Sequence, residues 1–96
     1  MQFLLIAYDG TDSDAEKRRM KVRPTHLEKI KPLKRSGAVI FGGAILDDQG
    51  KMIGSTILYE FPDRDTLDAQ LLDEVYINEG VWKEIKIVPF RLAQLD

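Results

Sequence analysis

The sequence contains one histidine, His26, and no cysteine. Imidazole both accepts and donates a proton near neutral pH, so His26 is the first candidate for acid–base chemistry. It lies four residues from Val22 and four from Ile30, which places it beside the apolar stripe of a helix and directs it inward. A lone histidine in such a position is also typical of a structural residue that is hydrogen-bonded at the margin of a core.

A functional histidine usually needs a carboxylate that fixes its tautomer and raises its basicity. Asp73 and Glu74 follow directly on two leucines at the expected end of a helix. A negative charge at that end interacts unfavourably with the helix dipole, which favours another role for these acids. The alternative is that both are solvated residues at a helix C-terminus. The residues alone leave open which of the two faces His26.

Several other residues could bind an anionic substrate. Arg23 and Arg18 could neutralise its charge, and Tyr76 lies close to the candidate acids in sequence. The pairs Gly42-Gly43 and Gly54-Ser55 could present backbone N–H groups and a hydroxyl to an oxyanion. Small residues that strand curvature and packing require are the alternative explanation for both pairs.

The sequence lacks the motifs of the common nucleophilic, nucleotide-dependent and metal-dependent enzymes. It has no G-x-S-x-G, no phosphate-binding loop and no H-E-x-x-H, and one histidine cannot build a histidine-rich metal site. We therefore expect neither a cofactor nor a metal ion.

Apolar patterns predict the elements that position these residues. The apolar run 3–8 reads as a strand buried on both faces and ended by Asp9-Gly10. Ser13 and Glu16 form a capping-box pattern, so a helix should follow and close at Gly37. Proline lacks the N–H group and clashes with the carbonyl four residues back, and both Pro24 and Pro32 lie inside this helix. The helix should therefore be bent or split, and we expect a break just before Pro24.

The remaining chain alternates in the same way between strand and helix patterns. We expect strands at 38–46, 52–61 and 81–92, a hairpin turn at 47–50, a second helix that starts at Pro62-Asp63, and an irregular stretch at 73–80. The order is βαββαβ, the ferredoxin-like α+β arrangement with an antiparallel sheet and both helices on one face.

This arrangement leaves one sheet face bare. Because the strands 3–8 and 52–61 are apolar on both faces, a monomer would expose a large hydrophobic patch. A homodimer joined through the open sheet faces removes that patch, with room for a small-molecule cavity between the sheets.

Composition predicts a single domain, since the chain has 96 residues, of which 44% are hydrophobic and 31% charged. The net charge is −2, but residues 16–35 carry nine Lys and Arg against two Glu, a local charge of +7. Such a helix could meet an anionic partner or the acidic face of a second copy, or it could be a solvated face.

Nucleic-acid and membrane partners are not expected. RNA-recognition motifs share the βαββαβ order but stack bases on aromatic residues of their central strands. Residues 51–59 lack that pattern, and the basic charge lies on the helix. No apolar run approaches the roughly 20 residues of a membrane span, and residues 1–7 are too short for a signal peptide. We therefore expect a cytoplasmic protein.

Segments in order along nearly the whole chain resemble the YciI-like family. They are Glu16-Lys17-Arg18, Arg23-Pro24-Thr25-His26-Leu27, Gly37, Gly42-Gly43-Ala44-Ile45, Gly54-Ser55, Tyr76, Gly80-Val81-Trp82 and Val88-Pro89-Phe90.

The resemblance implies a ferredoxin-like fold, a homodimer with packed sheets and a histidine–aspartate pair in a pocket. It also implies kinship with muconolactone isomerase-like and dimeric α+β barrel proteins. Most members of the YciI-like family have no assigned reaction, while at least one degradative branch of it is associated with dehydrochlorination of a chlorinated hydroquinone. His26 takes the place of the family's histidine. Where the family usually reads Asp-Pro-Tyr, this chain reads Glu74-Val75-Tyr76.

The leading hypothesis is a small lyase-like or isomerase-like enzyme, in which His26 moves a proton on a small anionic or phenolic molecule. Glu74 or Asp73 would orient His26, Arg23 and Arg18 would neutralise the substrate's charge, and Ser55 would donate a hydrogen bond. The alternative is a dimeric small-ligand-binding or accessory protein without turnover.

Overall fold

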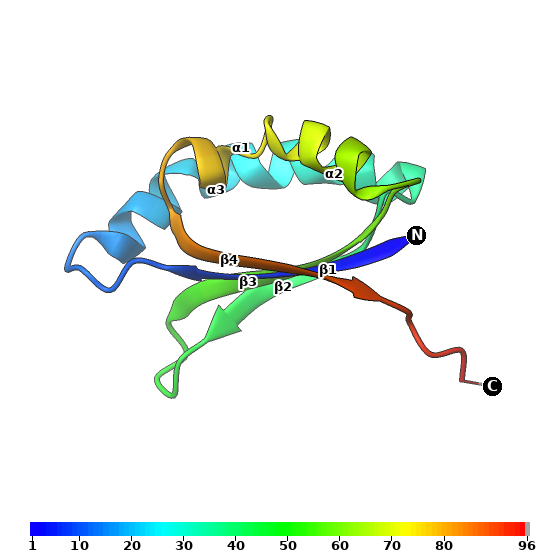
Figure 1. Cartoon of the computed structure of the whole chain (residues 1–96). Helices are drawn as coiled ribbons and strands as arrows, with labels where there is room; N and C mark the ends of the chain where they lie inside the picture. Colours follow the sequence, from blue (N-terminus) through cyan, green and yellow to red (C-terminus); the bar gives the residue numbers. More distant parts are fainter. Residues whose placement is uncertain (96) are drawn as a thin grey trace.

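The structure, a computed structural model, describes residues 1–95. Its elements in chain order are β1 (Gln2–Asp9), α1 (Ala15–Ser36), β2 (Val39–Leu46), β3 (Met52–Glu60), α2 (Arg64–Leu71), α3 (Val75–Asn78) and β4 (Trp82–Phe90). The four strands form one antiparallel sheet in the order β2-β3-β1-β4. All three helices cover the same face of this sheet (Figure 1). The predicted ferredoxin-like α+β fold is confirmed.

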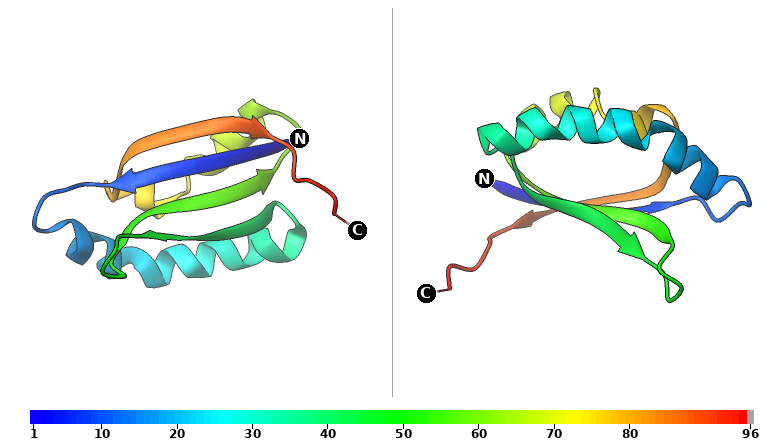
Figure 2. Two further views of the ribbon diagram at one scale, coloured as in Figure 1. Left: turned by 90° about the horizontal axis from the view of Figure 1, so that it is seen from below. Right: turned by 180° about the vertical axis from the view of Figure 1, so that it is seen from behind.

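Helix α1 is continuous from Ala15 to Ser36, so the predicted break before Pro24 is wrong. Pro24 removes one backbone hydrogen bond and presses on the carbonyl four residues back, which bends a helix without necessarily ending it. Figure 2 shows the ribbon of α1 changing direction between its blue N-terminal turns and its cyan middle. The helix survives because residues on either side of the proline, Arg19 and His26, are buried against the rest of the fold.

The two ends of α1 differ in how well the sequence predicted them. The residue before the helix is Asp14, and its side chain makes no capping hydrogen bond, so the predicted capping box of Ser13 and Glu16 does not form. At the other end Gly37 adopts the left-handed conformation, with φ 86°, and its N–H donates to the carbonyl of Lys34. Glycine reaches that conformation without steric cost, so the helix ends where the sequence predicted.

The second helix starts where the sequence predicted, whereas the segment after it differs from the prediction. The Asp63 side chain accepts a hydrogen bond from the Thr66 N–H, while the Thr66 hydroxyl contacts the Asp63 backbone, which completes a capping box for α2. The stretch 73–80, predicted to be irregular, contains the one-turn helix α3. This turn matters because Glu74 stands at its N-terminus and Tyr76 within it.

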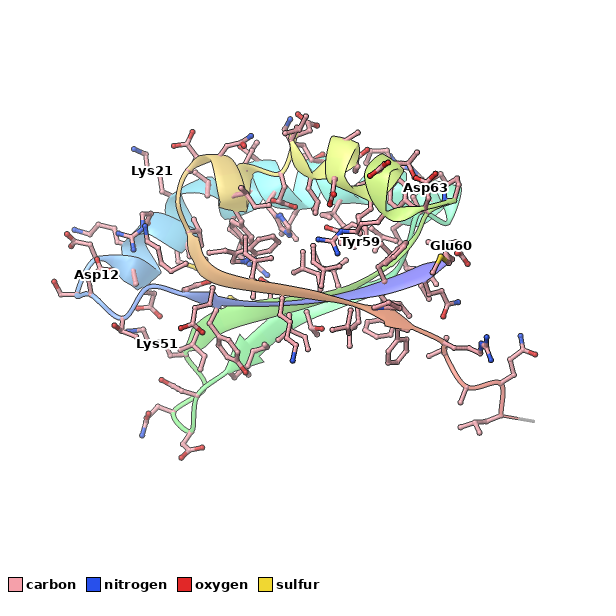
Figure 3. The ribbon with its side chains drawn as sticks, in the orientation of Figure 1. Asp12, Lys21, Lys51, Tyr59, Glu60 and Asp63 are labelled. Atoms are coloured by element: carbon pink, nitrogen blue, oxygen red, sulfur yellow. The ribbon has the colours of Figure 1, made fainter. Side chains whose placement is uncertain are left out.

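The main core lies between the sheet and the helices. Phe3, Leu5 and Ala7 of β1 point into it, together with Ile57 and Tyr59 of β3. Figure 3 shows the Tyr59 side chain in this layer, above the sheet and beneath the helices. Burial raises the pKa of the Tyr59 phenol far above its ordinary value, so this group stays protonated.

The opposite side of the sheet has no helix on it (Figure 1). Residues paired directly across antiparallel strands share a face, so the register places a group of large apolar side chains on this open sheet face. They include Leu4, Ile6, Tyr8, Phe41, Ile45, Met52, Leu58, Val88 and Phe90. Leu4 and Ile6 are half-buried and Tyr8 is 42% exposed, so β1 is fully buried on one face only in the single chain.

Candidate active site

The imidazole of His26 and the carboxylate of Glu74 form a buried pair. Nδ1 of His26 lies 2.8 Å from Oε2 of Glu74, and each residue is 8% exposed. The pair joins the middle of α1 to the start of α3, which are separated by 48 residues in sequence. An imidazole held this way by a carboxylate is oriented for proton transfer.

Glu74 is held in place by the local backbone. It precedes α3 in extended conformation, with φ −82° and ψ 114°, and the same Oε2 atom accepts a hydrogen bond of 3.0 Å from the Tyr76 N–H. An ionised carboxylate only accepts hydrogen bonds, so in the neutral imidazole the proton belongs on Nδ1. The lone pair of Nε2 is then free, and this atom makes no hydrogen bond to any other residue within 1–95.

Two aromatic rings enclose the imidazole. Tyr76 stacks on His26 with ring centroids 4.0 Å apart and planes 13° from parallel. Trp82 meets the His26 ring edge-on at 6.4 Å and the Tyr76 ring at 5.5 Å. Burial raises the pKa of the Tyr76 phenol, against the opposing effect of the nearby arginines. These rings restrict the imidazole to one orientation and limit the access of water to it.

A second polar network lies beside the first. Nη1 of Arg19 donates to both carboxylate oxygens of Asp9 at 3.0 and 3.1 Å, and Nη2 donates to the Ser55 hydroxyl oxygen at 2.8 Å. The Trp82 indole N–H donates to the same Ser55 oxygen at 3.1 Å. The guanidinium carbon of Arg19 lies 4.7 Å from the centre of the Tyr76 ring. The two networks therefore meet at Tyr76 and Trp82.

The Arg19–Asp9 ion pair is almost fully shielded from solvent, with each side chain 3% exposed. Burial raises the pKa of the Asp9 carboxyl, while the Arg19 charge and hydrogen bonds oppose that rise. An ion pair in such a setting costs desolvation energy, and it is stable only when its geometry and further hydrogen bonds compensate. Here the bond from Arg19 to Ser55 supplies part of that compensation.

A cavity of about 260 Å³ opens between α1 and the β2–β3 side of the sheet. His26, Tyr76 and Ser55 line it, and so do the cationic residues Arg23 and Lys34. The remaining lining residues are Arg19, Leu27, Ile30, Val39, Gly42, Gly43, Ala44 and Ile57. No Asp or Glu contributes to this lining. The cavity thus combines an oriented imidazole with an environment that favours a negative charge.

Five of the residues singled out from the sequence line this cavity: His26, Tyr76, Arg23, Ser55 and Gly43. A Cβ at Gly43 would meet no atom within 4 Å, so this glycine borders open space. The neighbouring residue of Ser55, Gly54, is needed for packing, because a Cβ there would collide with the carbonyl oxygen of Ala7.

Two of the predicted site residues lie elsewhere. Asp73 forms an exposed ion pair with Lys29, in which Oδ1 lies 2.7 Å from Nζ. Of the two candidate acids, it is therefore Glu74 that contacts His26. Arg18, near the start of α1, forms an ion pair with Asp12 of the preceding loop, with Nη2 lying 2.8 Å from Oδ1. Figure 3 shows Asp12 at the outer end of the molecule. One residue along a helix turns the side chain by about 100°, which is why Arg18 faces away while Arg19 faces inward.

Sequence reasoning missed three members of the site, each of which has a signal in the pattern. Arg19 precedes His26 by seven residues, two helical turns, and so shares its face. Asp9 continues the inward alternation of Phe3, Leu5 and Ala7. Trp82 is the first residue of β4, and its signal is the segment Gly80-Val81-Trp82 that resembles the family.

Over residues 1–95, no three His, Cys, Asp or Glu side chains gather closely enough to hold a metal ion. Within the same residues, no helix has the length and apolar character that crossing a bilayer requires.

The four-stranded sheet with helices on one face, enclosing a buried imidazole–carboxylate pair, defines a ferredoxin-like α+β protein with a candidate acid–base site. The sequence profile of the YCII-related domain matches residues 1–91. The chain therefore belongs to the YCII-related domain family.

Comparisons with known proteins agree with this assignment. The chain is 27% identical to "Protein YciI" of Escherichia coli O6:H1, over 92% of this chain and 96% of the relative, and equally similar to "Protein YciI" of Shigella flexneri. Its fold matches the 5-chloro-2-hydroxyhydroquinone dehydrochlorinase TftG of Burkholderia phenoliruptrix AC1100, solved in complex with 2,5-dihydroxybenzoquinone. That match has a TM-score of 0.83 at 21% identity and covers 97% of this chain and 96% of TftG.

A dimeric ferredoxin-like protein of unknown function from Jannaschia sp. CCS1 also matches. The TM-score is 0.51 at 13% identity, over 95% of this chain and 98% of that protein. At these identities the structural matches establish the fold.

Proposed function

We propose that the protein is a small enzyme in which His26 transfers a proton on a small anionic or phenolic molecule, by isomerisation or elimination. Nε2 of His26 acts as the base or acid, and Glu74 fixes the tautomer through Nδ1. The single observation that carries this proposal is the buried 2.8 Å bond between Nδ1 and Glu74 Oε2 at the wall of a cavity.

The charge of the cavity supports the choice of substrate class. Arg23 and Lys34 line it, and no carboxylate does, so an anion gains from entering. The volume of about 260 Å³ suits a molecule of about the size of one substituted ring. The likeness to TftG, whose solved complex holds 2,5-dihydroxybenzoquinone, makes acidic hydroxylated rings the first compounds to test.

The first experiment measures binding of 2,5-dihydroxybenzoquinone and turnover of 5-chloro-2-hydroxyhydroquinone. We expect the wild type to bind the quinone, and a variant with His26→Asn to lose any turnover by a factor of about 10² to 10⁴, the usual contribution of general acid–base catalysis. Glu74→Gln should reduce turnover as well, and Asp73→Asn should leave it unchanged because Asp73 pairs with Lys29 outside the cavity.

The same measurements separate the enzyme from a binding module. Binding without turnover across a panel of acidic phenols and small lactones, unaffected by His26→Asn, would favour the non-catalytic ligand-binding protein. Absence of binding throughout the panel would contradict both.

We also propose that two copies pack through the open sheet face. That face carries a group of large apolar side chains, among them Phe41 at 40% and Phe90 at 37% exposure. Soluble monomers rarely leave a contiguous apolar patch of this kind uncovered.

Light scattering after size-exclusion chromatography tests the dimer. We expect twice the 11.0 kDa chain mass for the wild type and the mass of one chain for Phe41→Lys. Leu72→Lys is the matched control, because Leu72 is 79% exposed in the helical layer, on the other side of the sheet. A monomeric wild type, or a dimer that tolerates Phe41→Lys but not Leu72→Lys, would contradict this arrangement.

A further inference from the structure

The hydrogen bonds of Ser55 reveal a donor that the protein itself does not use. A serine hydroxyl has two acceptor lone pairs and one O–H donor. Both lone pairs are occupied, by Arg19 Nη2 at 2.8 Å and by Trp82 Nε1 at 3.1 Å. Within residues 1–95, the hydroxyl donates to no acceptor, although Ser55 is 2% exposed. Because Ser55 lines the cavity with His26, the unused O–H is available to a ligand there.

The two bonds that Ser55 accepts also strengthen the bond that it can donate. One comes from a guanidinium, and a hydroxyl that accepts from a charged group is polarised toward donation. Arg19 is itself held by Asp9, with 3% exposure on each side chain, so the hydroxyl oxygen cannot readily move. Donors fixed in advance and shielded from water stabilise negative charge better than donors that must reorganise.

We infer that the Ser55 hydroxyl holds the oxyanion of an enolate, so that the substrate is an enolisable carbonyl compound or the keto form of a hydroxylated ring. This inference rests on the proposed function, because it needs His26 to act on the same molecule. Ser55 is then a catalytic residue that touches the substrate oxygen, and Arg19 and Trp82 are positioning residues that aim its hydrogen.

The proton transfer balances with these groups alone. Nε2 of His26 takes a proton from the carbon beside the carbonyl, and the C–H electron pair becomes the double bond of the enolate. The carbonyl electron pair moves to the oxygen, which accepts the Ser55 O–H. Where the substrate carries a further carbon–carbon double bond next to the deprotonated carbon, the product is a dienolate. Return of the proton to the far end of that second double bond moves the double bond into conjugation with the re-formed carbonyl and completes an isomerisation. Alternatively the enolate re-forms the carbonyl and expels a leaving group with its electron pair from the next carbon, after which the imidazolium gives its proton to water.

The test uses two probes of similar shape, 4-nitrophenol and nitrobenzene, of which only the first offers an oxyanion. The absorption spectrum of 4-nitrophenol reports whether the bound form is the phenol or the phenolate. We expect the wild type to bind the phenolate and to prefer it to nitrobenzene. Ser55→Ala should weaken phenolate binding by about tenfold or more, since hydrogen bonds to charged groups are the strong ones. Nitrobenzene binding should change by less than about threefold.

Two further variants guard against a purely structural effect. Ser55→Thr keeps a hydroxyl and should retain the phenolate preference, while Arg18→Met, outside the cavity, should change neither affinity. If Ser55→Ala does not fold, the wild type and Ser55→Thr still decide: equal binding of both probes by the wild type would overturn this inference and leave the proposed function standing. Binding of neither probe would overturn both. A Ser55→Ala protein that keeps the wild-type preference would overturn the role of Ser55 alone.

Discussion

The ion pairs on the two sides of α1 differ in how far they are buried. On its inner side, Arg19 pairs with Asp9 and His26 pairs with Glu74, and all four side chains are at most 10% exposed. On its outer side, the sequence neighbours of two of them, Arg18 and Asp73, form ion pairs with side chains 27% to 62% exposed. Arg19 and Glu74 therefore each have a natural control one position away.

Burial, and not the presence of an ion pair, distinguishes the candidate site from the surface. An exposed pair gains little, because water and salt screen it and two long side chains lose freedom. A buried pair is costly to break, because the surviving partner is left charged without a solvent shell. Substitution of Arg19 or Glu74 should therefore cost much more stability than substitution of Arg18 or Asp73.

The largest expected effect follows from loss of the buried guanidinium. Arg19→Met leaves Asp9 without its partner and Ser55 without one donor, so we expect a loss of about 3–5 kcal/mol in the free energy of unfolding. Arg18→Met should lower the free energy of unfolding by much less, because solvent and salt screen the exposed Arg18–Asp12 pair. Urea unfolding followed by tryptophan fluorescence of Trp82 measures both. Equal effects of the two substitutions would contradict the distinction between the two sides of α1.

The acids at the start of α3 give the next largest difference. Glu74→Gln keeps the size of the side chain but weakens the bonds from His26 and from the Tyr76 N–H, so we expect a loss of about 1–3 kcal/mol. Asp73→Asn should leave stability unchanged. Thermal unfolding of the two variants in parallel provides the comparison, and a larger loss for Asp73→Asn would count against the pairing described here.

The pKa values of Asp9 and Asp12, the partners of Arg19 and Arg18, should lie on opposite sides of the ordinary pKa of an aspartate. Arg18 lowers the pKa of Asp12 from 3.8 to about 2, and burial raises the pKa of Asp9. The contribution of Asp12 to stability is therefore present above its unfolded pKa and is lost as the pH falls through its folded pKa. The contribution of Asp9 has the opposite sign: it is present below the unfolded pKa and is lost as the pH rises through the folded pKa.

Carbon-13 NMR of the carboxyl groups between pH 1.5 and pH 7, a range chosen to bracket both transitions, measures the two titrations directly. We expect the Asp12 midpoint near 2 and the Asp9 midpoint above 3.8. Arg18→Met should return Asp12 toward its ordinary value. It should also raise the Asp9 midpoint further, because the Arg18 charge is one of the influences that lower the pKa of Asp9. Midpoints in the reverse order would show that burial does not govern Asp9.

The smallest expected effect is a gain. Val75 occupies the first position of α3, where its N–H makes no hydrogen bond to the described residues. Proline suits that position and lowers the entropy of the unfolded chain, so Val75→Pro should stabilise the protein by about 0.4–1 kcal/mol. Thermal unfolding checks the gain. A destabilised variant would mean that the backbone before Tyr76 differs from that of the Asp-Pro-Tyr motif.

The sequence predicted the strands, the second helix and the inward position of His26, because apolar periodicity and capping residues act locally. It did not predict that α1 continues through Pro24, because the packing of Arg19 and His26 offsets the local cost of the proline. Residue spacing left Asp73 and Glu74 as equal candidates, since the one-turn helix α3 separates their directions and its apolar signal is too short to recognise. The Asp9–Arg19–Ser55 network joins three distant segments, so only the fold brings it together.

The tautomer of His26, the only histidine of the chain, shows whether Glu74 orients this imidazole. Nitrogen-15 NMR of the neutral imidazole distinguishes a proton on Nδ1 from one on Nε2. We predict the proton on Nδ1 in the wild type and in Asp73→Asn, with redistribution toward Nε2 in Glu74→Gln. A wild-type imidazole protonated on Nε2, or a tautomer that Glu74→Gln leaves unchanged, would contradict the claim that Glu74 prepares His26 for proton transfer.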